Sequence, residues 1–262
     1  MKLDYIIVGQ GIAGTMLSWF LLQRGKKIVV IDKFNPEAAS NVAAGIINPV
    51  TGRKLTKAWM VDELLPFCRD IYAKLATELG EQFYFPKDII KIFTSEREAL
   101  GWNERLEEDE VKPYVQPFGE HPQYAGKLAL PFGAVEIKNA GYVLLNQLIG
   151  CYRLELKKLG VVVDEWFDFA RLEAEHNRIS YEGWEAQRIV FCEGFGGNAN
   201  PFFPELPFAL TKGEVLTLRI PDLPEDYILN NQYWMVPLGG QLFRAGATYN
   251  WDRLDAVPTA EA

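Results

Sequence analysis

The chain begins with apolar runs that are interrupted by one glycine-rich turn. Residues 5–8 form a β-branched apolar run, which predicts a buried strand. A turn of sequence Gly-Gln-Gly-Ile-Ala-Gly follows at residues 9–14, and an apolar stretch continues to Leu22. A second β-branched run, from Lys27 to Ile31, ends at Asp32. The order of strand, glycine turn, helix, strand and acid predicts a βαβ nucleotide-binding unit.

Each glycine of this turn has a separate physical role. Gly9 permits the tight turn, Gly11 lets a pyrophosphate approach the backbone, and Gly14 lets the helix pack against the strand. The helix that begins at Ile12 and Ala13 directs free N–H groups at the phosphates. Asp32 is placed to accept hydrogen bonds from the ribose hydroxyls. A turn without any ligand is the alternative, and FAD and NAD would both use these features.

The remaining hydrophobic pattern predicts both helices and strands. Helical spacing covers residues 59–79, about 95–108 and 142–159, and strand-like runs are expected over 83–94, 127–138, 171–175, 178–181, 188–192, 208–220, 232–237 and 241–248. The chain therefore enters a parallel sheet, leaves it, returns and leaves again. This order predicts two interleaved domains, a nucleotide-binding domain of residues 1–58 and 139–200 and a second domain of residues 59–138 and 201–262 with an antiparallel meander.

Composition and charge narrow the class of protein. The chain of 262 residues is 48% hydrophobic and 24% charged, which is ordinary for a soluble globular protein. Its net charge of -8 disfavours nucleic-acid binding. Three cysteines in no CxxC pair and two histidines outside any motif predict neither disulfides nor a metal site. The apolar stretch near the N-terminus contains turn glycines, so we expect no signal peptide, no membrane span and a cytoplasmic protein.

The segment after Asp32 is rich in small residues. Residues 33–49 read Lys-Phe-Asn-Pro-Glu-Ala-Ala-Ser-Asn-Val-Ala-Ala-Gly-Ile-Ile-Asn-Pro. This segment resembles the D-amino acid oxidase and glycine oxidase family, in which a serine and a small-small-glycine stretch wrap the pyrophosphate and reach the flavin. The resemblance implies FAD as the cofactor and an α/β fold, with a Rossmann-like FAD-binding domain interleaved with an antiparallel-sheet α+β substrate domain. It implies cofactor contacts from Lys33, Ser40, Ala43, Ala44, Gly45 and Ile46.

Two later segments carry the same resemblance. The strand at 188–192 runs into a glycine turn, as does a family strand that ends against FAD, which implies cofactor contacts from Cys192, Glu193 and Gly194. Residues 233–237 (Tyr-Trp-Met-Val-Pro) and 246–248 (Gly-Ala-Thr) are similar to substrate-domain strands of the family. Trp234 holds the position of an aromatic residue that faces the substrate there, and a core aromatic is the alternative. Family members continue past the Gly-Ala-Thr strand, so we expect a chain that lacks the closing C-terminal segment.

The resemblance also implies a chemistry, the oxidation of a C–N bond by hydride transfer to flavin. A small amine or amino acid would be the substrate. A substrate carboxylate needs a cation, and arginine suits it because the guanidinium can bind both oxygens. Arg53, just past the flavin loop, is the preferred candidate, with Arg219 and Arg244 as others. A solvated surface arginine is the alternative for each.

Three other functions remain open at this stage. A relative of the same fold that acts on modified tRNA is disfavoured by the acidic charge. A non-catalytic or incomplete dinucleotide-binding protein is consistent with the missing C-terminal segment. An NAD-dependent dehydrogenase is disfavoured by the loop at residues 40–46, because simple dehydrogenases lack such a loop after the second strand.

Overall fold

The chain crosses three times between two structural units. The computed structural model describes residues 2–51, 56–175 and 178–261. The first unit holds the chain up to Ala43 and Leu145–Leu210, and the second holds Ala44–Leu144 and the chain from Thr211 onward. Residues 44–51, 56–58 and 139–144, which the sequence pattern assigned to the nucleotide-binding domain, are thus in the second unit, and residues 201–210 are in the first. The assignment of cofactor binding to one unit and substrate binding to the other stays a prediction.

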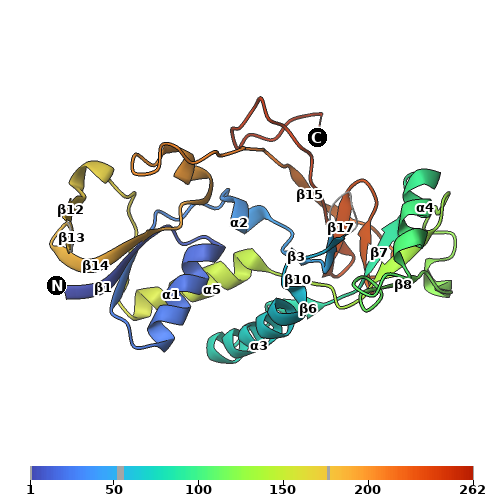
Figure 1. Ribbon diagram of the computed structural model, residues 1–262, viewed down its shortest axis with the longest axis horizontal. Helices are drawn as coiled ribbons and strands as arrows, with labels where there is room; N and C mark the ends of the chain where they lie inside the picture. Colours follow the sequence, from blue (N-terminus) through green and yellow to red (C-terminus); the bar gives the residue numbers. More distant parts are fainter. Residues whose placement is uncertain (1, 52–55, 176–177, 262) are drawn as a thin grey trace. The chain divides into compact units, whose positions relative to one another are not determined.

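A six-stranded sheet in the order β11-β2-β1-β14-β13-β12 forms the first unit. The elements of this unit are β1 (Lys2–Val8), α1 (Ile12–Gln23), β2 (Ile28–Ile31), α2 (Ala39–Val42), α5 (Leu145–Lys158), β11 (Val162–Val163), η2 (Phe169–Arg171), β12 (Glu173–Glu175), β13 (Arg178–Tyr181), β14 (Trp184–Phe191) and η3 (Gly194–Ala199). β1 pairs in parallel with β14 (Figure 1). It also pairs in parallel with β2, which in turn pairs in parallel with β11. The predicted strand–helix–strand order is therefore present in the parallel part of this sheet, to which β13 and β12 add antiparallel pairs.

β1 and β2 are buried on both faces of the sheet. Ile6 and Ile7 point to opposite faces of β1, and neither exposes any surface. On one face, Ile6 packs in a cluster with Val29 and Tyr181. α1 contacts β1, β2 and α5, and α5 also contacts β11. Burial on both faces explains why these strands read as continuous apolar runs rather than as alternating ones.

The second unit is built on mostly antiparallel sheets, with one parallel pair between β16 and β7. Its described elements are β3 (Ile46–Ile47), β4 (Val50–Thr51), β5 (Thr56–Lys57), α3 (Val61–Leu79), β6 (Tyr84–Pro86), β7 (Ile89–Ile92), α4 (Glu96–Arg105), β8 (Val115–Pro117), η1 (Pro122–Tyr124), β9 (Ala134–Ile137), β10 (Gly141–Val143), β15 (Val215–Arg219), β16 (Ile228–Asn230), β17 (Trp234–Gly239) and β18 (Leu242–Gly246). The largest sheet has the order β15-β18-β17-β16-β7-β9-β8, and a smaller one has the order β3-β10-β6. β15, β18, β17 and β16 are joined by antiparallel pairing, as a meander requires.

Side chains of the large sheet divide between two hydrophobic clusters. Ile89 and Val236 belong to the main core of the second unit, together with residues of α3 and α4. Ile90 and Met235, their neighbours along the strands, belong to a separate cluster. This alternation is the period-two pattern of a strand, and it shows which residues share a face.

The three longest predicted strands are shorter or divided in the structure. The run at 83–94 is two strands, because β6 pairs with β10 whereas β7 pairs with β9 and β16. Pro86 ends β6, since proline has no N–H to donate to a ladder. The run at 127–138 is a strand only at β9, after Gly133, whose φ is +89°. The run at 208–220 is a strand only at β15.

The predicted helix at 142–159 begins three residues later. Tyr142 and Val143 belong to β10, where they pair with Phe85 and Tyr84 of β6. This pairing with a distant segment overrides the local helical spacing. The helix ends as the sequence predicts, with Gly160 at a φ of +68° directly after its last turn. No helix in the described ranges is long and apolar enough to cross a membrane.

Candidate cofactor site

The glycine turn joins the end of β1 to the start of α1. Gly9 has a φ of +95°, and a Cβ on it would lie 2.4 Å from the carbonyl oxygen of Cys192. A Cβ on Gly14 would lie 1.9 Å from the carbonyl oxygen of Gly9. Real Cβ atoms do not approach backbone this closely, so both positions require glycine.

The first turn of α1 is arranged as an anion site. Its N-cap is Gly11, and no acidic side chain lies in the first turn. The Oγ of Ser40 accepts a hydrogen bond of 3.1 Å from the N–H of Ile12, 28 residues away in sequence. A Cβ on Gly11 would lie 3.1 Å from the same Oγ. The helix amides, the dipole and the Ser40 hydroxyl together form a donor set that suits a phosphate group.

Asp32 follows β2 and faces the same turn. Its Oδ2 accepts the N–H of Gln10 at 2.8 Å, and its Oδ1 accepts from Nη1 of Arg153 at 2.7 Å. The side chain is 19% exposed. Because an ionised carboxylate offers about four lone-pair positions, two remain available. The carboxylate can therefore still accept bonds from the two hydroxyls of a ribose.

Arg153 is the residue of this site that the sequence analysis missed. It lies on α5 with 5% of its side chain exposed. Besides Asp32 Oδ1, it donates to Oε1 of Gln10 at 2.7 Å and to the backbone oxygen of Asp32 at 2.8 Å, and it pairs with Asp164 at 3.3 Å. The available signal was an arginine within the buried stripe of a helix, since it lies among Leu148, Ile149, Tyr152 and Leu156.

Asp164 holds the outer side of this guanidinium. Burial opposes its ionisation, but the charges of Arg153, Lys33 and Lys157 and a hydrogen bond from Arg153 hold the pKa of Asp164 below its usual value. Lys33, which was predicted to contact the cofactor, lies 3.6 Å from Asp164 and is about half exposed. Asp164 therefore stays an anionic partner of Arg153 well into the acidic range.

The chain returns to the glycine turn after β14. The N–H of Cys192 donates to the carbonyl of Val8 at 2.6 Å, which extends the pairing of β14 with β1 by one residue. Burial and the nearby charge of Glu193 raise the pKa of the Cys192 thiol. Glu193 accepts from Nδ2 of Asn200 at 2.7 Å, and Gly194 begins η3 with a φ of +54°. The structure thus brings Cys192 to the turn.

The loop predicted to reach the flavin passes from the first unit into the second after Ala43. Gly45 has a φ of +66°, and a Cβ on it would lie 2.1 Å from the carbonyl oxygen of Val143. Ala44 and Ile46 pack against the main core of the second unit. The close approach that small residues indicated is therefore made, at Gly45, with a strand of the protein itself. Contacts of these residues with flavin stay a prediction.

Two candidate substrate residues share a face of the large sheet. In the register of β17 and β18, Trp234 lies opposite Gly246 and Val236 lies opposite Arg244. Because alternate residues of a strand point the same way and opposed residues share a face, Trp234, Val236 and Arg244 lie on one face. Trp234 is half-buried against the main core, and burial lowers the pKa of Arg244.

The other two candidate arginines differ from Arg244. Arg219 ends β15, is exposed, and donates to the backbone oxygen of Gly240 at 3.1 Å. Arg53, the preferred candidate from the sequence, lies outside the described residues. Arg219 lies on the same sheet face as Arg244 by register, so burial distinguishes the two arginines, together with the place of Arg244 on β18, which pairs directly with the strand of Trp234.

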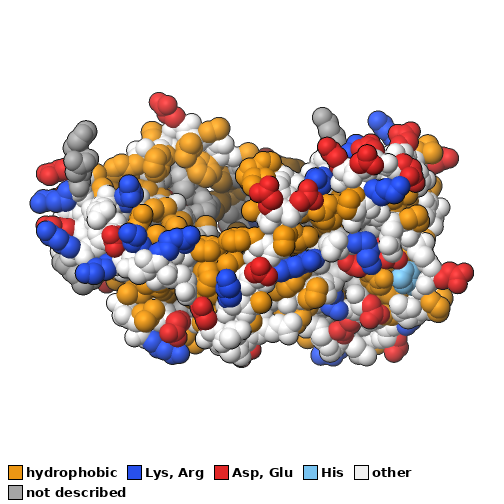
Figure 2. Space-filling view, turned by 60° about the horizontal axis from the view of Figure 1, so that its bottom comes forward, with side chains coloured by type: hydrophobic (Ala, Val, Ile, Leu, Met, Phe, Trp, Pro, Cys, Tyr) orange, Lys and Arg blue, Asp and Glu red, His pale blue; other side chains and the backbone are white. Residues whose placement is uncertain are grey.

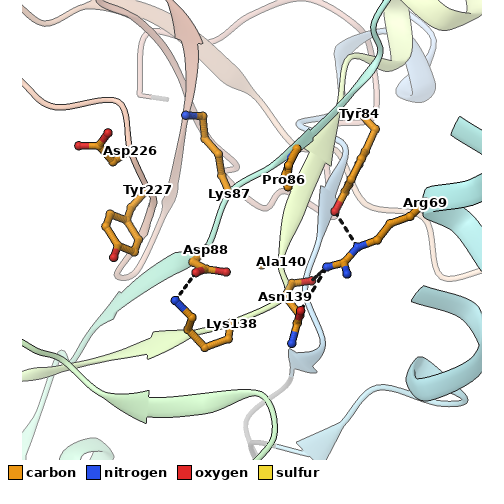
Figure 3. A pocket seen from close by; sticks show the side chains of 10 residues that line it. All are labelled: Arg69, Tyr84, Pro86, Lys87, Asp88, Lys138, Asn139, Ala140, Asp226 and Tyr227. Carbon is orange, nitrogen blue, oxygen red and sulfur yellow. Dashed lines mark hydrogen bonds and ion pairs between the residues drawn. The ribbon is translucent and has the colours of Figure 1, made fainter. Parts of the chain in front are cut away.

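A pocket of about 620 Å³ opens within the second unit (Figure 3). Arg69 points into it and donates to the hydroxyl of Tyr84 at 3.2 Å and to the backbone oxygen of Asn139 at 3.0 Å. Lys138 and Asp88 form an ion pair in its wall (Figure 3). None of the residues predicted to bind the cofactor lines this pocket.

Comparison with known proteins decides the family. The family model described as "FAD dependent oxidoreductase" (DAO) matches residues 4–262. The chain belongs to this family. Its cofactor is therefore FAD, and the family predicted from residues 33–49 and 188–194 is confirmed. Three features fit the ADP half of FAD. They are the donor set at α1, the partly exposed carboxylate of Asp32, and Gly11, where a Cβ would crowd the Ser40 hydroxyl.

Solved structures share the fold at low sequence identity. Glycine oxidase from Geobacillus kaustophilus is 17% identical with a TM-score of 0.78, and the match covers 97% of this chain and 73% of that one. Glycine oxidase from Bacillus cereus ATCC 14579 is 19% identical with a TM-score of 0.78 and the same coverages. L-Proline dehydrogenase from P. horikoshii is 13% identical with a TM-score of 0.75, over 99% of this chain and 74% of that one. These likenesses confirm the predicted mixed α/β fold class.

A curated relative matches over a shorter stretch. "Uncharacterized oxidoreductase YurR" of Bacillus subtilis (strain 168) is 38% identical over 56 residues, which are 21% of this chain and 15% of that protein.

Charged side chains of both signs are mixed on one face of the protein. On the face drawn in Figure 2, basic and acidic side chains of the described residues lie among one another and do not form a basic stripe.

Proposed function

We propose that this protein is an FAD-dependent oxidoreductase that oxidises a C–N bond of a small amine or amino acid by hydride transfer to the flavin. The observation that carries the proposal is the meeting of the glycine turn, Ser40 and Asp32 at the start of α1. Bound FAD supplies the hydride acceptor, and the protein supplies orientation and electrostatics.

The cofactor contacts follow from the positions of the predicted residues. Amides at the start of α1, among them that of Ala13, would hold the pyrophosphate, and Ile12 would contact it beside Ser40, whose Oγ accepts the Ile12 N–H. Asp32 would hold the adenosine ribose. Further contacts along the cofactor are proposed for Gly9, Gly11, Gly14, Lys33, Ser40, Ala43, Ala44, Gly45, Ile46, Cys192, Glu193 and Gly194.

The substrate class is supported by the names of similar structures. They denote enzymes of glycine, iminodiacetate and L-proline, each of which carries a carboxylate near its nitrogen. A carboxylate of this kind requires a cation in the site. Arg244 is supported because it shares a sheet face with Trp234, which would contact the rest of the substrate. Arg53 stays a second candidate from the sequence.

A visible absorption spectrum tests the cofactor, and anaerobic titration tests the reaction. The purified protein is incubated with FAD and desalted, and we expect the two bands of oxidised flavin to remain with it. Glycine, iminodiacetate, L-proline and simple amines are then added without oxygen, and a substrate bleaches the longer-wavelength band. Retained FAD that no compound reduces would instead indicate a non-catalytic dinucleotide-binding protein. A protein that retains no flavin would contradict the proposal.

A further inference from the structure

One buried guanidinium connects the two halves of the nucleotide site. Nη1 of Arg153 donates to Oδ1 of Asp32 and to Oε1 of Gln10. Its Nη2 donates to the backbone oxygen of Asp32. Planar guanidinium groups bind in a fixed geometry, so these three bonds set the position of Asp32 relative to Gln10. Gln10 lies between the first two glycines of the turn.

Gln10 is held on every side by the first unit. It is 3% exposed, and its N–H donates to Oδ2 of Asp32 at 2.8 Å. Its Nε2 donates to the backbone oxygen of Ile149 at 3.2 Å and lies 3.4 Å from Oγ1 of Thr15. The turn that faces the pyrophosphate and the acid that faces the ribose are therefore linked through Arg153.

The inner contacts of Asp32 leave its outer lone pairs for a ligand. Each carboxylate oxygen accepts one bond from within the unit, from Gln10 or from Arg153, and 19% of the side chain remains exposed. The carboxylate is thus fixed in rotation before any ligand binds. Fixing a binding group in advance improves affinity, because the ligand does not have to order it.

Packing and stability alone do not explain an arginine here. Replacing a buried ion pair by apolar residues of similar volume is often neutral or stabilising. The Nε of Arg153 is also buried with no hydrogen-bond partner among the described residues, which is unfavourable. A group that is costly to bury and that orders the acid of the nucleotide site has a clear use in binding.

We propose that Arg153 is a positioning residue for the adenosine ribose of FAD, acting through Asp32 and Gln10. The cation also holds the segment after Asp32, since its Cζ lies 5.7 Å from the ring centre of Phe34. This inference rests on FAD as the cofactor, and it assigns to α5 a part in recognising the ribose hydroxyls.

The test compares affinities for ADP, 2′-deoxy-ADP and 3′-deoxy-ADP, measured by competition with FAD for the apoprotein. The wild-type protein should bind ADP about 10 to 100 times more tightly than at least one deoxy analogue, because a hydrogen bond to a charged group contributes about 1.5–3 kcal/mol. Arg153→Met should reduce this ratio to roughly threefold or less and weaken FAD at least about tenfold. Lys158→Met is the control, since Lys158 lies on the same helix but is 74% exposed.

The ratio distinguishes positioning from a merely structural role. Equal weakening of ADP and both deoxy analogues in Arg153→Met, or an unchanged ratio, would overturn the proposal. Asp32→Asn should by itself make the affinities for ADP and the deoxy analogues nearly equal. Adding Arg153→Met to Asp32→Asn should change these affinities little. Should Arg153→Met fail to fold by circular dichroism, Arg153→Lys carries the test with an intermediate ratio expected. A wild-type protein that binds neither FAD nor ADP would count against the proposed function itself.

Discussion

Nη1 of Arg153 donates a 2.7 Å hydrogen bond to Oδ1 of Asp32, across 121 positions of sequence. Arg153 is 5% exposed, so this contact is shielded from solvent and from screening by salt. The sequence pattern predicts that Asp32 binds the ribose. The helix that fixes its side chain, α5, follows residues 44–144 of the second unit in the sequence.

Helix packing at the glycine turn should not tolerate a methyl group. Gly14→Ala places a Cβ 1.9 Å from the carbonyl oxygen of Gly9, so α1 must move away from β1. We expect a loss of about 2 kcal/mol or more in the free energy of unfolding and a loss of FAD retention after desalting. Urea unfolding and the flavin spectrum measure these effects.

Gly150→Ala is the matched control for that change. Gly150 lies within α5 of the same unit, and its Cβ would meet nothing within 4 Å. Alanine is preferred over glycine in helices by up to about 1 kcal/mol, so this variant should be as stable as the wild type or more stable. Equal behaviour of the two variants would contradict the role of Gly14.

Arg244 should affect substrate binding more than cofactor binding. Arg244→Met removes a cation on the sheet face of Trp234. For an amino-acid substrate we expect KM to rise at least about tenfold, because a charge-assisted hydrogen bond contributes about 1.5–3 kcal/mol, whereas FAD retention should be unchanged. Steady-state rates with the substrate found by flavin bleaching provide the measurement.

Arg219→Met is the control for the meander arginines. Arg219 is exposed at the end of β15 and its described partner is a backbone carbonyl, so KM should stay within about twofold of the wild type. If both variants behave alike, Arg244 is not the carboxylate cation and Arg53 becomes the residue to replace.

Acid stability should depend on one buried carboxylate of the second unit. The Glu136 side chain is 3% exposed, lies 2.6 Å from Nε2 of His121 and accepts from Gln116 at 2.9 Å. Burial opposes its ionisation, but hydrogen bonds with His121 and the backbone of Gly119 and the charges of His121 and Lys138 bring the pKa of Glu136 below its usual 4.5. A carboxyl whose pKa is lower in the folded state stabilises above the unfolded value and loses that contribution as the pH falls through the folded value.

Stability of the wild type should therefore decline below about pH 4.5. Glu136→Gln should reduce the free energy of unfolding at neutral pH by roughly 1–3 kcal/mol and show a shallower decline in acid. Glu107→Gln, at a side chain that is 82% exposed, should follow the wild-type curve. Urea unfolding by tryptophan fluorescence at several pH values measures both, and parallel curves for Glu136→Gln and the wild type would exclude this role.

Local patterns of the sequence determined the nucleotide-binding unit and the family. The strand, turn, helix and second strand lie within 31 successive positions from Lys2 to Asp32, so their spacing can be read without knowing any distant contact. Glycine also marked the ends of α3 and α5, where Gly80 and Gly160 take positive φ angles that few other residues adopt. These signals depend on backbone conformation, which neighbouring residues largely control.

Tertiary structure alone decided the contacts between distant segments. Helical spacing at Tyr142 did not reveal that this residue pairs with β6, and the small residue at Gly45 gave no sign that its close neighbour is Val143. Nor could alternation along one strand say which face Arg244 shares, since that depends on the register with β17. Arg153 bonds to Asp32 because α5 packs beside α1. This packing joins distant segments, so no local pattern of the sequence predicts it.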